Sequence, residues 1–252
     1  MTITEVFRNP TVKQVIFQIR YPNLFFIENK IGDLQLKIMD KFPESALLFR
    51  RQVVFADIGP YTKIENIPDD ASAMAKKIWQ FTSPKGYELN VLSDSLDITS
   101  NTHKTYNNPA SDNKFRDFIE FILNNFLEIT KIPLVTRIGL RYIDECPIPE
   151  KRNDVFQDYY NSTFPLSRFK IEDATAMQFV TTVSKDGCLI RYAESLIQKG
   201  DKYILTLDFD ASARDISTTN VLDTTDKLHD IISEEYEATI KEPVYKYMRG
   251  EE

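Results

Sequence analysis

The sequence is poor in the residues from which most catalytic and metal-binding motifs are built. Its 252 residues include two cysteines, two histidines and seven glycines. Zinc sites need clusters of Cys and His, and nucleophilic catalysis most often needs a His beside the nucleophile. The two cysteines form no CxxC pair, and the chain contains neither an HExxH nor a GxSxG motif. The common zinc sites and nucleophilic hydrolase motifs are therefore excluded.

Phosphate-binding loops and membrane spans are also missing. The chain contains neither GxxxxGK[ST] nor GxGxxG, the loops whose backbone amides bind phosphates. Its longest apolar runs are of strand length, well short of the roughly 20 residues that a membrane span needs. The N-terminus lacks the basic and apolar regions of a signal peptide. We therefore expect a cytoplasmic protein with reduced thiols that does not enter a membrane.

The charge balance is acidic, with 38 acidic against 31 basic side chains and a net charge of −7. An acidic chain repels phosphate backbones, so broad nucleic-acid binding is not expected, although a local basic patch could still bind an anion. Hydrophobic residues make up 42% of the chain. A chain of this length and composition can bury a core without disulphides or metals.

Hydrophobic periodicity predicts an α+β fold with antiparallel sheets covered by two long helices. Apolar residues at helical spacing mark the long helices at about 111–131 and 225–241, and a further helix at 24–42. Phe118, Ile122 and Phe126 should be buried. Alternating apolar and polar residues predict strands at 11–21, 47–58, 77–81, 86–92, 95–99, 134–145, 175–183, 188–198 and 202–209.

The order of these elements suggests two closely associated halves, 1–147 and 148–252, each a run of strands followed by a helix. The segment 146–173 contains several prolines and is the best linker candidate, but its aromatic residues indicate packing instead of a free tether. An Arg precedes a Tyr on three predicted strands, in Ile19-Arg20-Tyr21, Leu140-Arg141-Tyr142 and Ile190-Arg191-Tyr192. This recurrence of Arg followed by Tyr does not indicate an internal duplication, because β-branched, aromatic and alternating polar residues are favoured in any strand.

Three segments of the chain together resemble a known family. They are Asn9–Phe17 (NPTVKQVIF), Arg137–Ile143 (RIGLRYI), and the helix from Leu228-His229-Asp230 through Thr239-Ile240. They resemble the uncharacterised family of sporadically distributed proteins of bacteria and archaea, in the same order and over nearly the whole chain. In that family an acid usually stands where Gln14 stands here. The resemblance implies a prokaryotic accessory protein, and patchy occurrence is typical of defence and toxin–antitoxin loci.

The predicted strand at 134–145 carries the most informative polar pattern. Arg137, Gly139 and Arg141 lie on the face opposite its most apolar residues, and the glycine leaves room for a ligand to lie across them. Arg20 would join them if the first strand pairs with this one. Because a planar guanidinium group can bind a carboxylate or phosphate through two hydrogen bonds, Arg20, Arg137 and Arg141 form a candidate site for an acidic partner segment or small anionic ligand.

A structural explanation of the same arginines stays open. Arg commonly pairs with carboxylates that are exposed or half-buried. The acids could come from neighbouring strands, or from Glu234, Glu235 and Glu237 on the last helix. In that case the arginines would hold the fold together, and removing one would leave a carboxylate without its partner.

Carboxylates at two strand ends support an alternative, enzymatic hypothesis. Asp208 and Asp210 lie on one face of a strand, and Asp144 ends another. If those strand ends converge, their oxygens could hold Mg²⁺. Together with Arg137 and Arg141, such a site would fit a metal-dependent enzyme acting on a phosphorylated or nucleotide substrate. The competing interpretation is that these carboxylates are solvated strand ends.

Without a complete catalytic motif, the sequence favours a non-enzymatic protein that binds a protein partner or a small anionic ligand and needs no cofactor. His103 lies in a polar stretch and His229 lies on the last predicted helix. Both are interpreted as ordinary surface or helix-packing residues, because neither stands in a catalytic context.

Overall fold

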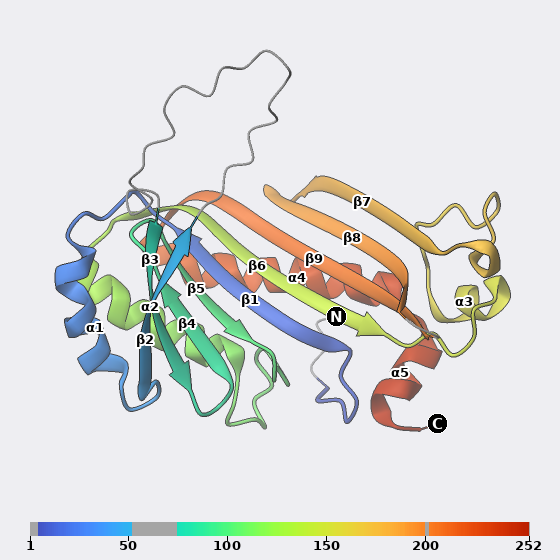
Figure 1. Cartoon of the computed structure of the whole chain (residues 1–252), viewed down its shortest axis with the longest axis horizontal. Helices are drawn as coiled ribbons and strands as arrows, with labels where there is room; N and C mark the ends of the chain where they lie inside the picture. Colours follow the sequence, from blue (N-terminus) through green and yellow to red (C-terminus); the bar gives the residue numbers. More distant parts are fainter. Residues whose placement is uncertain (1–4, 52–74, 200–201, 252) are drawn as a thin grey trace, which may run out of the picture.

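The computed structural model describes residues 5–51, 75–199 and 202–251, which form an antiparallel sheet with its main helices on one face (Figure 1). Within these residues the sheet has nine strands in the order β2-β3-β4-β5-β1-β6-β9-β8-β7. The strands are β1 (Val12–Arg20), β2 (Glu44–Arg51), β3 (Ala75–Ser83), β4 (Tyr87–Val91), β5 (Ser95–Ser100), β6 (Leu134–Cys146), β7 (Ala176–Lys185), β8 (Cys188–Lys199) and β9 (Lys202–Ser217). The helices are α1 (Ile31–Ile38), α2 (Phe115–Thr130), α3 (Asn153–Tyr159), α4 (Val221–Thr239) and α5 (Glu242–Arg249), with 3-10 turns η1 (Ile27–Lys30), η2 (Ile171–Asp173) and η3 (Thr218–Asn220).

The chain follows the same path twice, and the two passes meet at the centre of the sheet. In the first pass β1 is followed by α1, the β2–β5 meander and α2; in the second, β6 is followed by α3, the β7–β9 meander and α4. The last strand of each meander pairs with the strand that began the pass, β5 with β1 and β9 with β6, and β1 pairs with β6. The sheet therefore continues across the expected boundary at residues 147 and 148, and the division into halves stays a prediction.

The core lies between one face of the sheet and the helices α1, α2 and α4. Val15, Phe17 and Ile19 of β1 are fully buried there, because alternation along a strand sends every second side chain to the same face. On α2 the predicted core residues Phe118, Ile122 and Phe126 are buried. The other face of the sheet, called the open face below, carries none of these helices within the described residues (Figure 1).

The α+β class with antiparallel strands is confirmed, but two details of the prediction differ. The strands form one sheet instead of several. Only one helical run is long, the 22 residues from η3 through α4, whereas α2 has 16 residues and begins at Phe115. The amides of Phe115 and Arg116 donate to the carbonyls of Thr105 and Tyr106 in the preceding loop. These hydrogen bonds belong to the loop, so α2 begins at Phe115 and not at residue 111.

Several predicted ends also move. Pro243, expected to follow the last helix, lies instead in the first turn of α5, a position that tolerates its missing amide. The candidate linker 146–173 contains α3, and its Phe156, Tyr160 and Phe164 are buried. Of the strand expected at 47–58, the part beyond residue 51 lies outside the described residues.

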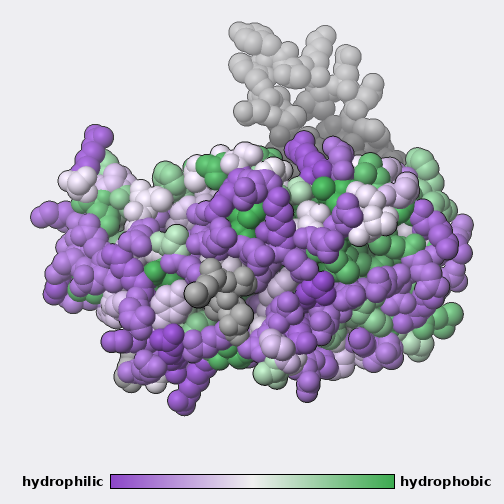
Figure 2. Space-filling model, turned by 180° about the vertical axis from the view of Figure 1, so that it is seen from behind, coloured by the Kyte–Doolittle hydropathy of each residue, from purple (hydrophilic) through white to green (hydrophobic). Residues whose placement is uncertain are grey.

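The surface on the helix side is mainly hydrophilic (Figure 2). This agrees with the amphipathic character of α4, whose buried residues include Leu228, Ile232 and Tyr236 while Asp223 lies in its first turn. Among the described residues, no helix is both long and apolar enough to cross a membrane.

Candidate functional site

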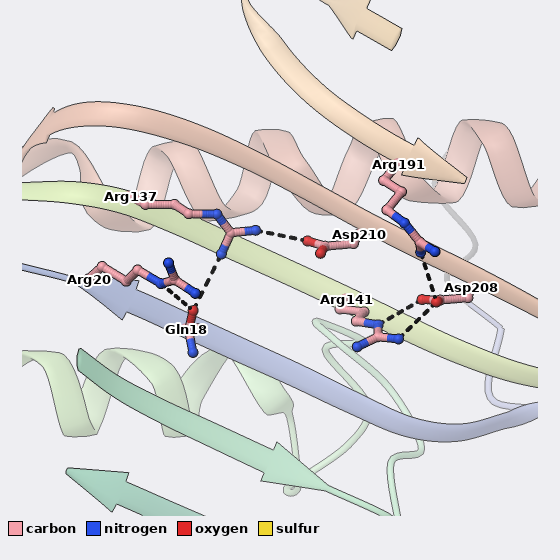
Figure 3. A network of polar contacts seen from close by, with 7 residues as sticks. All are labelled: Gln18, Arg20, Arg137, Arg141, Arg191, Asp208 and Asp210. Atoms are coloured by element: carbon pink, nitrogen blue, oxygen red, sulfur yellow. Dashed lines mark hydrogen bonds and ion pairs between the residues drawn. The ribbon is translucent and has the colours of Figure 1, made fainter. Parts of the chain in front are cut away.

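The three predicted arginines meet on the open face, at the centre of the sheet. β1 and β6 pair so that Arg20 lies opposite Arg137 and Gln18 lies opposite Gly139. The pairing that the sequence required for Arg20 to join the other two is therefore present. Figure 3 shows these side chains on one side of the sheet, with Asp208 and Asp210 of β9 among them.

One carboxylate, that of Asp208, binds two arginines. Arg141 donates from Nε and Nη2 to Oδ1 and Oδ2 of Asp208 at 2.7 and 2.8 Å, and Arg191 of β8 donates from Nη1 to Oδ2 at 3.1 Å. The Asp208 side chain is 13% exposed, against 41% for Arg141 and 40% for Arg191. The carboxylate thus lies beneath the two guanidinium groups. Hydrogen bonding to Asp208 raises the pKa of Arg141, so this side chain stays cationic.

Arg137 occupies the space that the sequence assigned to a ligand. Its Nη2 donates to Asp210 Oδ1 at 3.1 Å, and its Nη1 donates to Gln18 Oε1 at 3.4 Å. A Cβ atom built at Gly139 would lie 2.5 Å from Nη1 of Arg137. Gly139 therefore makes room for the guanidinium group of Arg137, and the expectation of an open space across this glycine is corrected.

Arg20 differs from the other arginines because it pairs with no carboxylate among the described residues. Its Nε donates to Gln18 Oε1 at 3.1 Å, the same oxygen that accepts from Arg137. We call Arg20, Arg137, Arg141, Arg191, Asp208 and Asp210 the arginine cluster. Four guanidinium groups and two carboxylates give it a surplus of two positive charges in an otherwise acidic protein.

The surroundings of the arginine cluster differ on its two sides. Arg214 of β9, opposite Arg137 in register, extends the basic region. Toward β5 the face becomes acidic at Asp97, which lies opposite Gln18. On β7 and β8 it becomes apolar, where exposed Val180, Leu189 and Ile197 belong to the same face.

Of the two groups of acids that the sequence offered as partners for the arginines, one pairs with them and the other does not. Neighbouring-strand carboxylates do pair with the arginines, but Glu234 and Glu235 of α4 bind Lys185 of β7 instead. Helix α4 covers the opposite face of the sheet, out of reach of Arg137 and Arg141 (Figure 3).

Asp144 does not converge with Asp208 and Asp210. Its side chain lies on the helix-covered face and is 2% exposed, whereas the other two lie on the open face. Asp144 of β6 pairs with Leu207 of β9, and Leu207 is a buried residue of the core face. The condition for a shared Mg²⁺ site is therefore not met, and the described residues contain no group of three His, Cys, Asp or Glu able to hold a metal.

Asp144 instead lines a pocket between the sheet and α4, together with both histidines of the chain. His103 and His229 are 7% and 8% exposed, so the surface interpretation of His103 is wrong. Local sequence could not indicate this pocket, because His103 reaches it only through the folding of a polar loop onto the core. Arg191 was also missed as a site residue, although a Tyr follows it on its strand, as a Tyr follows Arg20 and Arg141.

Comparison with known proteins adds no further assignment. No protein-family model and no curated protein matches the chain, so membership of the sporadically distributed family stays a prediction.

Proposed function

We propose that this chain is a non-enzymatic binding protein whose arginine cluster receives an acidic segment of a partner protein. The observation that carries the proposal is the position of Asp208 beneath Arg141 and Arg191. A guanidinium group has five N–H donors, and Asp208 takes two from Arg141 and one from Arg191. The remaining donors are held near solvent in a fixed orientation. Such preorganisation lowers the entropy that binding an anion costs.

The extent of the cluster favours a segment with several carboxylates over a single small anion. Its arginines lie on β1, β6 and β8, with β9 between the last two. At about 4.8 Å per strand, β1 and β8 are roughly 14 Å apart, wider than one carboxylate or phosphate group. The exposed apolar residues beside it suit the mixed polar and apolar composition of a protein interface.

The resemblance noted in the sequence adds a setting to this proposal. It suggests that the partner belongs to an accessory, defence or toxin–antitoxin locus. The structure disfavours the metal-dependent alternative, because Asp144 lies on the other side of the sheet from Asp208 and Asp210.

The proposal can be tested with a fluorescent oligoglutamate peptide and fluorescence anisotropy. We expect binding that weakens from low to physiological salt, as exposed charge pairs do. Arg20→Gln should weaken it about tenfold, because charge-assisted hydrogen bonds are lost. The melting temperature of this variant should stay close to that of the wild type, since removing the Arg20 guanidinium group leaves no carboxylate without a partner.

Arg152→Gln is the control, because it removes the same charge from an exposed residue just before α3 that contacts no member of the arginine cluster. It should bind the peptide like the wild type. Failure of the peptide to bind, or equal binding by both variants, would contradict the proposal. Binding of citrate or phosphate by a protein that does not bind the peptide, measured by calorimetric titration, would assign the cluster to a small anion instead.

A further inference from the structure

A separate pocket lies on the helix-covered side of the sheet, between β6 and α4. Polar residues from distant parts of the chain line it, among them Thr11, His103, Tyr142, Asp144, His229 and Tyr236. Its volume is about 100 Å³, somewhat smaller than the roughly 150 Å³ cavity that takes up benzene in another protein. The exposed residues Glu5 and Lys104 also line it, so the pocket reaches the surface beside them.

Asp144 places a buried carboxylate in this pocket without a cationic partner among the described residues. Thr11 Oγ1 donates to its Oδ1 at 2.8 Å and lies 2.6 Å from the hydroxyl of Tyr236. The Tyr236 hydroxyl also donates to the sulfur of Met248 at 3.6 Å and makes no hydrogen bond to Asp144. One neutral hydrogen bond is little compensation for a carboxylate removed from water. Burial accordingly raises the pKa of Asp144 to about 7.

Two further polar atoms of the lining are buried without a hydrogen-bond partner in the described chain, Nδ1 of His103 and the hydroxyl of Tyr142. Their rings meet edge to face with centroids 5.4 Å apart. Buried polar atoms are nearly always satisfied in native proteins, so two orphans in one pocket point to a bound group. Burial lowers the pKa of His103 to about 3 and that of His229 to about 4, so both imidazoles are neutral and each offers an acceptor nitrogen.

Aromatic rings form much of the remaining wall. The ring of His229 stacks on Tyr106 with centroids 3.9 Å apart and meets the ring of Tyr142 edge to face at 6.0 Å. The faces of such rings are electronegative and attract cations. The pocket thus combines a buried carboxylate, neutral acceptors and aromatic rings, and the one basic residue in its lining, Lys104, is exposed.

We propose that this pocket binds a small primary ammonium compound. Its three N–H donors would bind Asp144 and the acceptors of His103 and Tyr142, and its short apolar part would contact the aromatic wall. An anion of the same size would meet Asp144 with no buried cation to offset the repulsion. This inference does not depend on the arginine cluster, which lies on the other side of the sheet.

The test is isothermal titration calorimetry of the full chain with ethylammonium, ethanolammonium, ethanol and acetate. We expect the two ammonium compounds to bind and the neutral and anionic probes of similar size not to bind. Asp144→Asn keeps the shape of the side chain and should weaken ammonium binding about tenfold or more, because a charge-assisted hydrogen bond is lost. The exposed Asp33→Asn serves as the charge-matched control and should bind like the wild type.

Tyr142→Phe gives a second measurement that does not depend on the folding of the first variant. It removes a hydroxyl without a partner, so the protein should fold normally and bind the ammonium compounds several-fold more weakly. Binding of acetate in preference to ethylammonium would overturn the proposal. So would the absence of ammonium binding, or unchanged affinity in Asp144→Asn. Arg20→Gln should leave ammonium affinity unchanged, which separates this result from the test of the arginine cluster.

Discussion

Asp144 and the two histidines respond to pH in opposite directions within one pocket. Burial raises the pKa of Asp144 from 3.8 to about 7, so between these values the folded protein holds a proton that the unfolded chain releases. The Asp144 contribution to stability is therefore lost as the pH rises from about 4 to 7. Burial lowers the pKa values of His103 and His229 from 6.5 to about 3 and about 4, so their contribution to stability grows as the pH rises from about 3 to 6.5.

Asp144→Asn should separate these opposing trends. The variant keeps the rising contribution of the histidines and loses the falling one of the carboxyl group. Its free energy of unfolding should therefore increase more steeply than that of the wild type between about pH 4 and 7, as measured by urea denaturation at several pH values. The Thr11 hydrogen bond and Lys13 both act to lower the Asp144 pKa, so they reduce the effect without reversing it. Parallel pH profiles for the two proteins would show that Asp144 is ionised throughout this range.

Arg141 and Arg191 should be energetically coupled through Asp208. Removing either one leaves Asp208 with its other partner, so Arg141→Gln or Arg191→Gln alone should cost about 0.5–1 kcal/mol of stability, as for half-exposed ion pairs. The double variant leaves the 13%-exposed carboxylate unpaired and should cost about 1 kcal/mol more than the sum of the two. Chemical denaturation of the three variants measures this coupling. Strict additivity would mean that Asp208 does not link the two arginines.

At the scale of elements, α2 is the helix whose packing the sequence predicted best. Its apolar stripe recurs every three or four residues, and Ile122 is completely buried at its centre. Ile122→Ala should destabilise the fold by about 2–5 kcal/mol, because truncation loses transfer free energy and leaves a cavity. Urea denaturation measures the change, and the exposed Leu36→Ala on α1 is a suitable control because it removes a similar side chain without opening a cavity. An unchanged midpoint for Ile122→Ala would contradict this packing.

Periodicity predicted which face of each strand is buried, but it could not predict which strands are neighbours. Alternation places Arg20, Arg137 and Arg141 on polar faces, and all three do lie on the open face. The same alternation places Asp208 and Asp210 together, yet nothing in the local pattern shows that β9 pairs with β6. The sequence therefore could not show that Arg137 pairs with Asp210 and Arg141 with Asp208 across adjacent strands. The role of Gly139 was missed for the same reason, since it depends on where the Arg137 side chain lies.

At the scale of the whole molecule, residues far apart in sequence build both candidate sites. The arginine cluster joins residue 20 of β1 to residues 208 and 210 of β9, and the pocket joins Thr11 to Tyr236. Such contacts arise from the two passes of the chain meeting at β1 and β6, and a reading limited to short windows of sequence cannot reveal them. The length, composition and periodicity nevertheless limit the fold correctly to an α+β class with antiparallel strands.

The meeting of the two passes at the centre of the sheet has a consequence for how the chain acquires this structure during synthesis. β1 pairs with β5 on one side and with β6 on the other. The first pass is complete when α2 has formed, but until β6 is made, one edge of β1 has unpaired amides and carbonyls. The other edge of β6 stays unpaired until β9, the last strand of the sheet, has been synthesised. A nascent chain therefore twice exposes a strand edge of the kind that recruits other chains. Formation of these long-range pairs should limit the folding rate.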